Sequence, residues 1–209
     1  FVASSASALS ANQPHVMLTP GIHAAYEKGV AALAGAEGVT TVARGAEAEG
    51  VNLAQSALFA TSGEQFRTNP ALSHEVFGSS SILVKCATIE EVIATIAQME
   101  GQLTATLQMD ESDNDNAAKL LPTLSRKVGR VLANGWPTGV EVTHAMVHGG
   151  PFPSTSDGRT TSVGTLAMMR FLRPVCYQDV VDAVLPPALQ AANPWKLNRR
   201  MEGKLELAQ

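Results

Sequence analysis

Residues 81–134 constrain the fold more than any other part of the chain, because strand-like and helix-like stretches alternate along them. Residues 81–86 form a continuous apolar run, which is typical of strands buried in parallel sheets. A helix is expected next over 88–99, where Thr88 and Glu91 have the spacing of a capping box. Two further strands with a helix between them complete the pattern, which predicts right-handed crossovers and a largely parallel sheet. The fold class that follows is α/β, a twisted sheet with flanking helices.

Before this segment the sequence predicts one helix and two strands. The sequence TPG at 19–21 is a helix start, with threonine as the N-cap and proline in the first turn. Apolar residues then recur at helical spacing as far as Gly35. β-branched and apolar runs predict strands over 39–43 and 57–61, while residues 1–16 are interpreted as a strand remnant followed by a loop.

After this segment comes a stretch rich in glycine, proline and histidine, residues 135–159. An irregular stretch of this length inside a compact domain indicates a functional loop. A short helix is expected over 162–170 and a strand over 171–178, where Pro174 favours a position at the sheet edge. The polar tail suggests an exposed end.

Charge and hydropathy exclude several classes of protein. The chain has 15 Lys and Arg against 19 Asp and Glu, a net charge of −4, and no basic block, so nucleic acid is not an expected partner. Hydrophobic residues make up 45% and charged residues 16%, which excludes global disorder. No apolar run approaches the length of about 18 residues that a membrane-spanning helix needs. Membrane is therefore not an expected partner either.

The two cysteines, Cys86 and Cys176, are far apart and lack the spacing of a zinc or disulfide framework. Both lie in apolar runs, so we expect buried, unreactive thiols in a reducing compartment, the cytoplasm. No serine-nucleophile motif, Walker loop or G-x-G-x-x-G motif is present. The local chemistry therefore indicates a domain that lines a ligand site rather than one that carries a reactive group.

The first candidate binding element is HEVFG at 74–78, directly before the buried run. The Glu75 carboxylate can accept hydrogen bonds from ligand hydroxyls, and Phe77 can pack against a flat or sugar-like group. The alternative is an ordinary loop glutamate and a core phenylalanine. The residues alone leave both interpretations open.

The second candidate lies at 143–153, where His144 and His148 are four residues apart. This spacing occurs in metal sites on helices, but Glu141 is the one further ligand nearby and a Gly-Gly-Pro sequence follows, so we expect no metal. The two glycines allow close backbone approach, and Phe152 is then either a pocket wall or a core residue. The acidic run 110–115 lacks the glycine and terminal glutamate of a calcium loop and is expected to cap a helix.

Four short motifs together resemble the C-terminal portion of the aldehyde dehydrogenase superfamily. HEVFG at 74–78 is similar to that family's E-x-F-G-P motif, and EGQLTATL at 100–107 is similar to its G-L-x-A-x-V strand. GRVLAN at 129–134 resembles its G-x-V-x-V-N strand, and HGGPF at 148–152 with GR at 158–159 resembles the loop before its last strand. Their order and spacing make the resemblance more specific than any one of them.

Three longer stretches resemble one branch of this family, which holds α-ketoglutaric semialdehyde (2,5-dioxovalerate) dehydrogenases and bacterial NADP-dependent fatty aldehyde dehydrogenases. They are NGWPTGVEV at 134–142, HAMVHGGP at 144–151 and RFLRPVCYQ at 170–178. The resemblance covers residues 17–187, almost the whole chain.

The resemblance implies a division of the chain into three parts. Residues 1–165 would be a partial catalytic domain, residues 166–185 a helix and the oligomerisation strand, and residues 186–209 a C-terminal tail. The family's nucleophilic cysteine, general-base glutamate and dinucleotide-binding domain would all lie upstream, so no catalytic residue is expected in this chain. Because the sequence also starts without Met, we expect it to be part of a longer enzyme and inactive alone.

By resemblance, the complete enzyme would oxidise a semialdehyde or aliphatic aldehyde to the acid through a cysteine thioester, with NAD or NADP as cofactor. Glu75 would hold the nicotinamide ribose hydroxyls and Phe77 would pack beside them, while Phe152 and His148 would line the aldehyde pocket. Ser79 stands where the family usually has proline. A homodimer or homotetramer would form through the strand over 171–178.

Two other functions remain as alternatives. The first is a free-standing, non-catalytic α/β module that oligomerises or interacts through its edge strand. The second is a hydrolase with His144 or His148 as the base, for which the sequence offers no convincing nucleophile.

Overall fold

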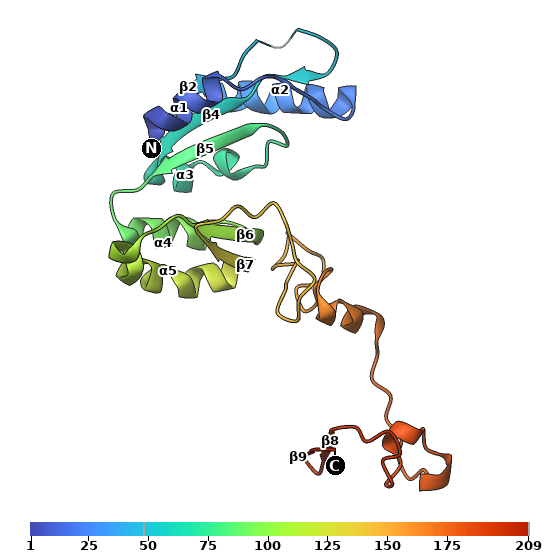
Figure 1. Ribbon diagram of the computed structural model, residues 1–209. Coiled ribbons are helices and arrows are strands. Elements are labelled where there is room, and N and C mark those ends of the chain that lie inside the picture. Colours follow the sequence, from blue (N-terminus) through green and yellow to red (C-terminus); the bar gives the residue numbers. More distant parts are fainter. Residues whose placement is uncertain (48, 209) are drawn as a thin grey trace. The chain divides into compact units, whose positions relative to one another are not determined.

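The computed structural model describes residues 1–47 and 49–208, and the chain divides into two compact units, Phe1–Ala167 and Met168–Gln209 (Figure 1). The boundaries expected from the sequence, at residues 165 and 185, stay predictions. The roles assigned to the three expected parts stay predictions.

The first unit alternates helices and strands along the chain. Its elements are α1 (Val2–Ser10), β1 (His15–Val16), α2 (Pro20–Ala34), β2 (Thr40–Arg44), β3 (Leu53–Ala54), β4 (Ala57–Ser62), α3 (Gly63–Thr68), η1 (Pro70–Ser73), β5 (Ser80–Lys85), α4 (Ile89–Gln98), β6 (Gln102–Leu107), η2 (Glu111–Asp113), α5 (Asn114–Lys127) and β7 (Val128–Ala133). The 3₁₀ helix η3 (Thr165–Phe171) follows, and the second unit adds η4 (Asp182–Val184), η5 (Pro187–Leu189), β8 (Arg199–Met201) and β9 (Lys204–Glu206).

Parallel pairing, the main expectation from the sequence, is confirmed for two pairs of strands. β4 pairs in parallel with β5, and β6 pairs in parallel with β7. The strands do not form one continuous sheet, however: β2, β4 and β5 form one sheet, in which β2 is antiparallel, while β6 and β7 form another. The connection through α4 joins β5 to β6 without making them neighbours, which a helical crossover permits. Within the described residues, β5 pairs only with β4, and β6 pairs only with β7.

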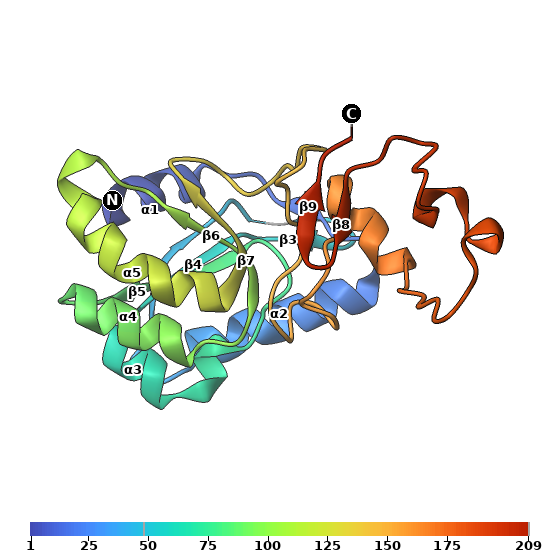
Figure 2. The same cartoon turned by 90° about the horizontal axis from the view of Figure 1, so that it is seen from below.

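The core of the first unit lies where α2 packs against the sheet β2–β4–β5. The largest fully buried side chains there are Tyr26 and Val30 of α2 and Phe59 of β4. α2 begins as the sequence predicts, with Thr19 Oγ1 accepting a hydrogen bond from Ile22 N at 3.2 Å and Pro20 in the first turn. α5 packs against β6 and β7 of the other sheet, and α4 lies beside α5 (Figure 1 and Figure 2).

Glu91 connects α4 to α3. As expected, Thr88 Oγ1 accepts from Glu91 N, but the Glu91 carboxylate accepts from Ala87 N at 2.7 Å rather than from the N-cap residue itself. Its other oxygen accepts from Arg67 at 3.2 Å. These bonds lower the pKa of Glu91, chiefly through the Ala87 amide and then through Arg67.

Two expected strands are absent from the part of the chain that the structure describes. Residues 2–10 form helix α1 instead of a strand remnant, because this stretch consists mostly of alanine, serine and leucine, and alanine is the strongest helix former. Residues 172–178 form neither helix nor strand, since no second strand of the described chain pairs with them. Their expected role in an oligomer stays a prediction.

Candidate functional site

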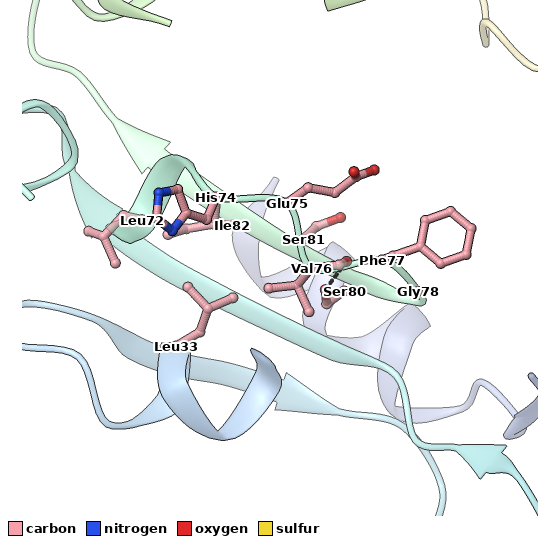
Figure 3. A pocket seen from close by; sticks show the side chains of 10 residues that line it. All are labelled: Leu33, Leu72, His74, Glu75, Val76, Phe77, Gly78, Ser80, Ser81 and Ile82. Atoms are coloured by element: carbon pink, nitrogen blue, oxygen red, sulfur yellow. Dashed lines mark hydrogen bonds between the residues drawn. The ribbon is translucent and has the colours of Figure 1, made fainter. Parts of the chain in front are cut away.

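Glu75 and Phe77 lie beside the same cavity, in a loop of residues 74–79 that we call the Glu75 loop. The cavity has a volume of about 570 Å³. It is lined by Leu33 of α2, Leu72 of η1, His74, Glu75, Val76, Phe77 and Gly78 of the loop, and Ser80, Ser81 and Ile82 of β5 (Figure 3). The loop therefore presents its polar and aromatic side chains at the beginning of a parallel strand.

The side chains of the Glu75 loop alternate in direction. Val76 points toward Leu33, whereas Glu75 and Phe77 point away from it (Figure 3). Val76 packs against the core, and a Cβ at Gly29 of α2 would lie 2.8 Å from Val76 Cγ1. Phe77 is 67% exposed, so the alternative that it is a core residue is wrong.

Glu75 is exposed, and its carboxylate has no hydrogen bond or ion pair within the described part of the chain. An ionised carboxylate has two oxygens that can each accept hydrogen bonds. The arrangement leaves this acceptor group available to a ligand with hydroxyl groups.

Tyr26 fixes the backbone that follows. Gly78 has a φ of 149°, a conformation that favours glycine, and a Cβ there would collide with the Tyr26 ring. The Tyr26 hydroxyl has one proton, which it can donate to Gln55 O at 2.7 Å or to Ser79 O at 3.2 Å. Ser79 O also accepts from Ala57 N at 3.0 Å. Ser79 thus holds the loop to β4 and α2 through its backbone carbonyl.

Phe152 and His148 belong to a second loop, residues 148–163, which we call the Gly149 loop. It packs backbone to backbone on the beginnings of β6 and β7. A Cβ at Gly129 would collide with Gly149 O, and a Cβ at Gly150 would lie 2.5 Å from Gln102 O. Neither residue lines the cavity of the Glu75 loop. Phe152 is 80% exposed, which contradicts the core alternative for this residue as well.

His148 is held by the far end of its own loop. His148 N donates to Thr161 Oγ1 at 2.8 Å, and the ring Nδ1 lies 2.8 Å from Ser162 Oγ. Sequence reasoning missed these two hydroxyl residues and Tyr26. Tyr26 is at helical spacing with Val30 in the sequence, but neither this spacing nor any local motif indicates a hydrogen bond to a distant loop.

The remaining candidates show no ligand-binding arrangement. Among the described residues no group of three His, Cys, Asp or Glu side chains is placed to hold a metal. Asp110 accepts from Ser112 Oγ and Ser112 N, and these bonds lower the pKa of Asp110, so the acidic run caps a helix as expected. Cys86 is half-buried and Cys176 is exposed, so the expected burial of both thiols is wrong for Cys176, whose segment lacks a partner strand.

No helix of the described chain has the length and hydropathy to cross a membrane.

The comparisons with known proteins give relatives in sequence and in structure, although no family model matches the chain. The chain is 50% identical over 206 residues to α-ketoglutaric semialdehyde dehydrogenase 2 of Azospirillum brasilense, covering 99% of this chain and 39% of that protein. It is 47% identical over 193 residues to α-ketoglutaric semialdehyde dehydrogenase of Acinetobacter baylyi, covering 92% of this chain and 37% of that protein.

Solved structures of low sequence identity share the fold. Betaine aldehyde dehydrogenase from Staphylococcus aureus matches 75% of the chain with a TM-score of 0.58 at 17% identity, over 30% of its own length. Proline utilization A from Bdellovibrio bacteriovorus matches 78% with a TM-score of 0.63 at 16% identity, over 16% of its own length. Together with the sequence matches, these confirm the resemblance. The chain therefore corresponds, over nearly its whole length, to one part of an aldehyde dehydrogenase.

Proposed function

We propose that the chain is the C-terminal portion of a longer NAD(P)-dependent aldehyde dehydrogenase that oxidises a semialdehyde, such as α-ketoglutaric semialdehyde, to the carboxylic acid. The observation that carries the proposal is the exposed, unpaired Glu75 carboxylate beside a cavity, on a loop that Tyr26 and Gly78 hold in place. The two relatives at about half identity, both named for that substrate, support it.

The residues of the Glu75 loop fit a nicotinamide cofactor. The two oxygens of Glu75 can accept hydrogen bonds from the two hydroxyls of a ribose, and the exposed Phe77 ring offers an apolar surface beside them. When bound, such a cofactor supplies the acceptor for a hydride. Because NAD and NADP share this ribose, the proposal holds for both. A Bacillus cereus aldehyde dehydrogenase with a similar fold was solved as its NAD⁺ complex.

The proposal places the nucleophilic cysteine and the general base in the rest of the polypeptide. The chain spans less than two fifths of the length of each of the two semialdehyde dehydrogenases named above, which leaves room for them. The one-sided pairing of β5 and β6 supports the same view, since strands with an unpaired edge can be completed by further strands. Phe152 and His148 of the Gly149 loop would then line the aldehyde pocket.

The two alternative functions are less well supported. A non-catalytic module is not favoured, because relatives at this level of identity are named as dehydrogenases. A hydrolase is not favoured, because the hydroxyl beside His148 is itself within hydrogen-bond distance of a backbone carbonyl.

We further propose that the longer protein forms a homodimer or homotetramer through residues 171–178. Phe171, Val175 and Tyr177 leave much of their apolar surface exposed, and an extended segment without a partner can pair with a second copy. Neither cysteine forms a disulfide, which fits a reducing compartment such as the cytoplasm.

The role of Glu75 is tested by Glu75→Ala in the longer polypeptide. Loss of hydrogen bonds from two hydroxyls to a charged group should raise KM for the nicotinamide cofactor, or slow hydride transfer, by roughly 10-fold or more. Glu100→Ala is the matched control, because Glu100 is exposed and does not line the cavity. Steady-state kinetics at varied cofactor concentration give KM for the cofactor and kcat, and kcat falls if hydride transfer becomes rate-limiting. Unchanged KM and kcat for Glu75→Ala would contradict the role of Glu75 in cofactor binding.

A further inference from the structure

The side chains of His148 and Ser162 contact one another across the base of the Gly149 loop. Ser162 Oγ lies 2.8 Å from His148 Nδ1 and 3.0 Å from His148 O. Ser162 N also donates to His148 O at 3.0 Å. Ser162 therefore contacts both the ring and the backbone of His148.

The positions of the protons follow from counting donors. A carbonyl oxygen cannot donate, so the 3.0 Å contact with His148 O is a hydrogen bond only if the Ser162 hydroxyl donates to it. That hydroxyl has a single proton, so the contact with Nδ1 is a hydrogen bond only if Nδ1 carries a proton and donates to Oγ. The opposite arrangement, with the hydroxyl donating to Nδ1, would leave two oxygens 3.0 Å apart with no proton between them.

We propose that Ser162 is a positioning residue that holds neutral His148 in the tautomer with the proton on Nδ1. The unprotonated nitrogen is then Nε2, and the ring is exposed. His148 thus presents a hydrogen-bond acceptor to a ligand that carries a hydroxyl group, such as a hydrated aldehyde or a bound water. This inference rests on the proposed function only in placing the ligand beside the Gly149 loop.

The backbone on both sides of the contact is held independently of the Ser162 hydroxyl. Thr161 is 5% exposed, accepts from His148 N and donates to Val163 O at 2.8 Å. The bond from Ser162 N to His148 O adds a further link. Ser162→Ala should therefore release the ring of His148 while leaving the two backbone segments together.

The tautomer can be measured directly in the 209-residue chain by two-bond ¹H–¹⁵N correlation of the histidine rings, at a pH where the imidazoles are neutral. We expect a protonated Nδ1 and an unprotonated Nε2 for His148. Ser162→Ala should shift His148 to mainly the Nε2–H form, and Ser162→Thr, which keeps a hydroxyl, should retain the Nδ1–H form. His144, exposed in the same part of the chain, is the internal reference and should not change.

An Nε2–H form of His148 in the unaltered chain would overturn the proposal, because the Ser162 hydroxyl would then donate to the ring, the direction that the hydrolase alternative requires. An unchanged tautomer in Ser162→Ala would overturn it as well. If Ser162→Ala does not fold, the measurement on the unaltered chain still decides between the two tautomers.

Kinetics of the longer polypeptide separate this inference from the proposed function. We expect Ser162→Ala to lower kcat/KM for the aldehyde by roughly fivefold, the effect of one misplaced hydrogen bond, and Ser162→Thr to restore it. If His148→Ala slows the enzyme but Ser162→Ala does not, the positioning role is wrong and the pocket role stands. If His148→Ala has no effect while the tautomer is as expected, the pocket role of His148 fails and the tautomer assignment stands.

Discussion

The Glu75 loop and the Gly149 loop both lie at the beginnings of parallel strands, but they are attached to the molecule in different ways. The Glu75 loop is fastened by side chains, since Val76 packs into the core and the Tyr26 hydroxyl bonds to Ser79 O. The Gly149 loop is fastened by backbone, since Gly129 and Gly150 allow chain segments to approach without an intervening side chain. In both loops an aromatic side chain is left exposed.

The two kinds of attachment determine which substitutions each loop can tolerate. Deleting atoms should weaken the Glu75 loop, because specific side chains hold it. Added atoms should disturb both loops, because a Cβ has no space at Gly78 of the Glu75 loop or at the glycines through which the Gly149 loop contacts β6 and β7. Each substitution below alters one contact that holds a loop, and its effect is measured as the change in the free energy of unfolding of the chain in urea.

Gly78→Ala should have the largest effect. It adds a Cβ at a φ of 149° and places it against the Tyr26 ring, so backbone strain and overpacking act together. We expect a loss of about 3 kcal/mol. The control is Gly21→Ala in α2, where the nearest atom is 3.9 Å from the new Cβ and alanine favours the helix. A loss below about 0.5 kcal/mol, within the range of ordinary surface substitutions, would show that Tyr26 and Gly78 do not constrain the loop.

Gly129→Ala should come next. Its Cβ would collide with Gly149 O, so the Gly149 loop must move away from β7, and we expect a loss of about 2 kcal/mol. Gly139→Ala is the control, because no atom lies within 4 Å of its Cβ. A shift of the His148 ring signals in Gly129→Ala, absent in Gly139→Ala, would show that the loop itself has moved. Equal stability of the two variants would contradict the proposal that backbone contact at Gly129 holds the Gly149 loop against β7.

Much of the fold could be predicted from local sequence, because its signals act over a few residues. Thr19 with Pro20 marked the start of α2, and apolar runs marked β4 and β5. The pairing of strands could not be predicted in the same way, since β5 and β6 follow one another in the sequence but belong to different sheets. Residues 172–178 have the composition of a strand, yet a strand also needs a partner, and composition does not supply one.

The candidate site shows the same limit. Family resemblance indicated Glu75, Phe77, His148 and Phe152, and the structure places each of them on an exposed loop surface. It did not indicate what holds them, because Tyr26 is 53 residues from Ser79 and the cavity of the Glu75 loop includes no residue of the Gly149 loop. Contacts over such sequence separations depend on the fold as a whole.

Tyr26→Phe should have the smallest effect and separates the hydrogen bond from the packing of the ring. The ring stays, but the hydroxyl whose one proton lies within reach of Gln55 O and Ser79 O is lost, and we expect a cost of about 1 kcal/mol. Tyr177→Phe in the second unit is the control and should leave stability unchanged.

Because the Tyr26 hydroxyl can ionise, we expect the stability of the chain to depend on pH in the alkaline range. Burial raises the pKa of Tyr26 above its ordinary value of 10.0, an effect that Arg44 opposes and Glu27 reinforces. Above that pH the unfolded chain releases the phenol proton while the folded chain retains it, so the contribution of Tyr26 to stability is complete below pH 10.0 and declines as the pH rises further. Urea unfolding at about pH 9 and about pH 11 should therefore show a smaller decline for Tyr26→Phe than for the unaltered chain. Equal declines would mean that the phenol ionises as readily in the folded chain as in the unfolded one. The hydrogen bond from the Tyr26 hydroxyl to the Glu75 loop would then not stabilise the folded chain.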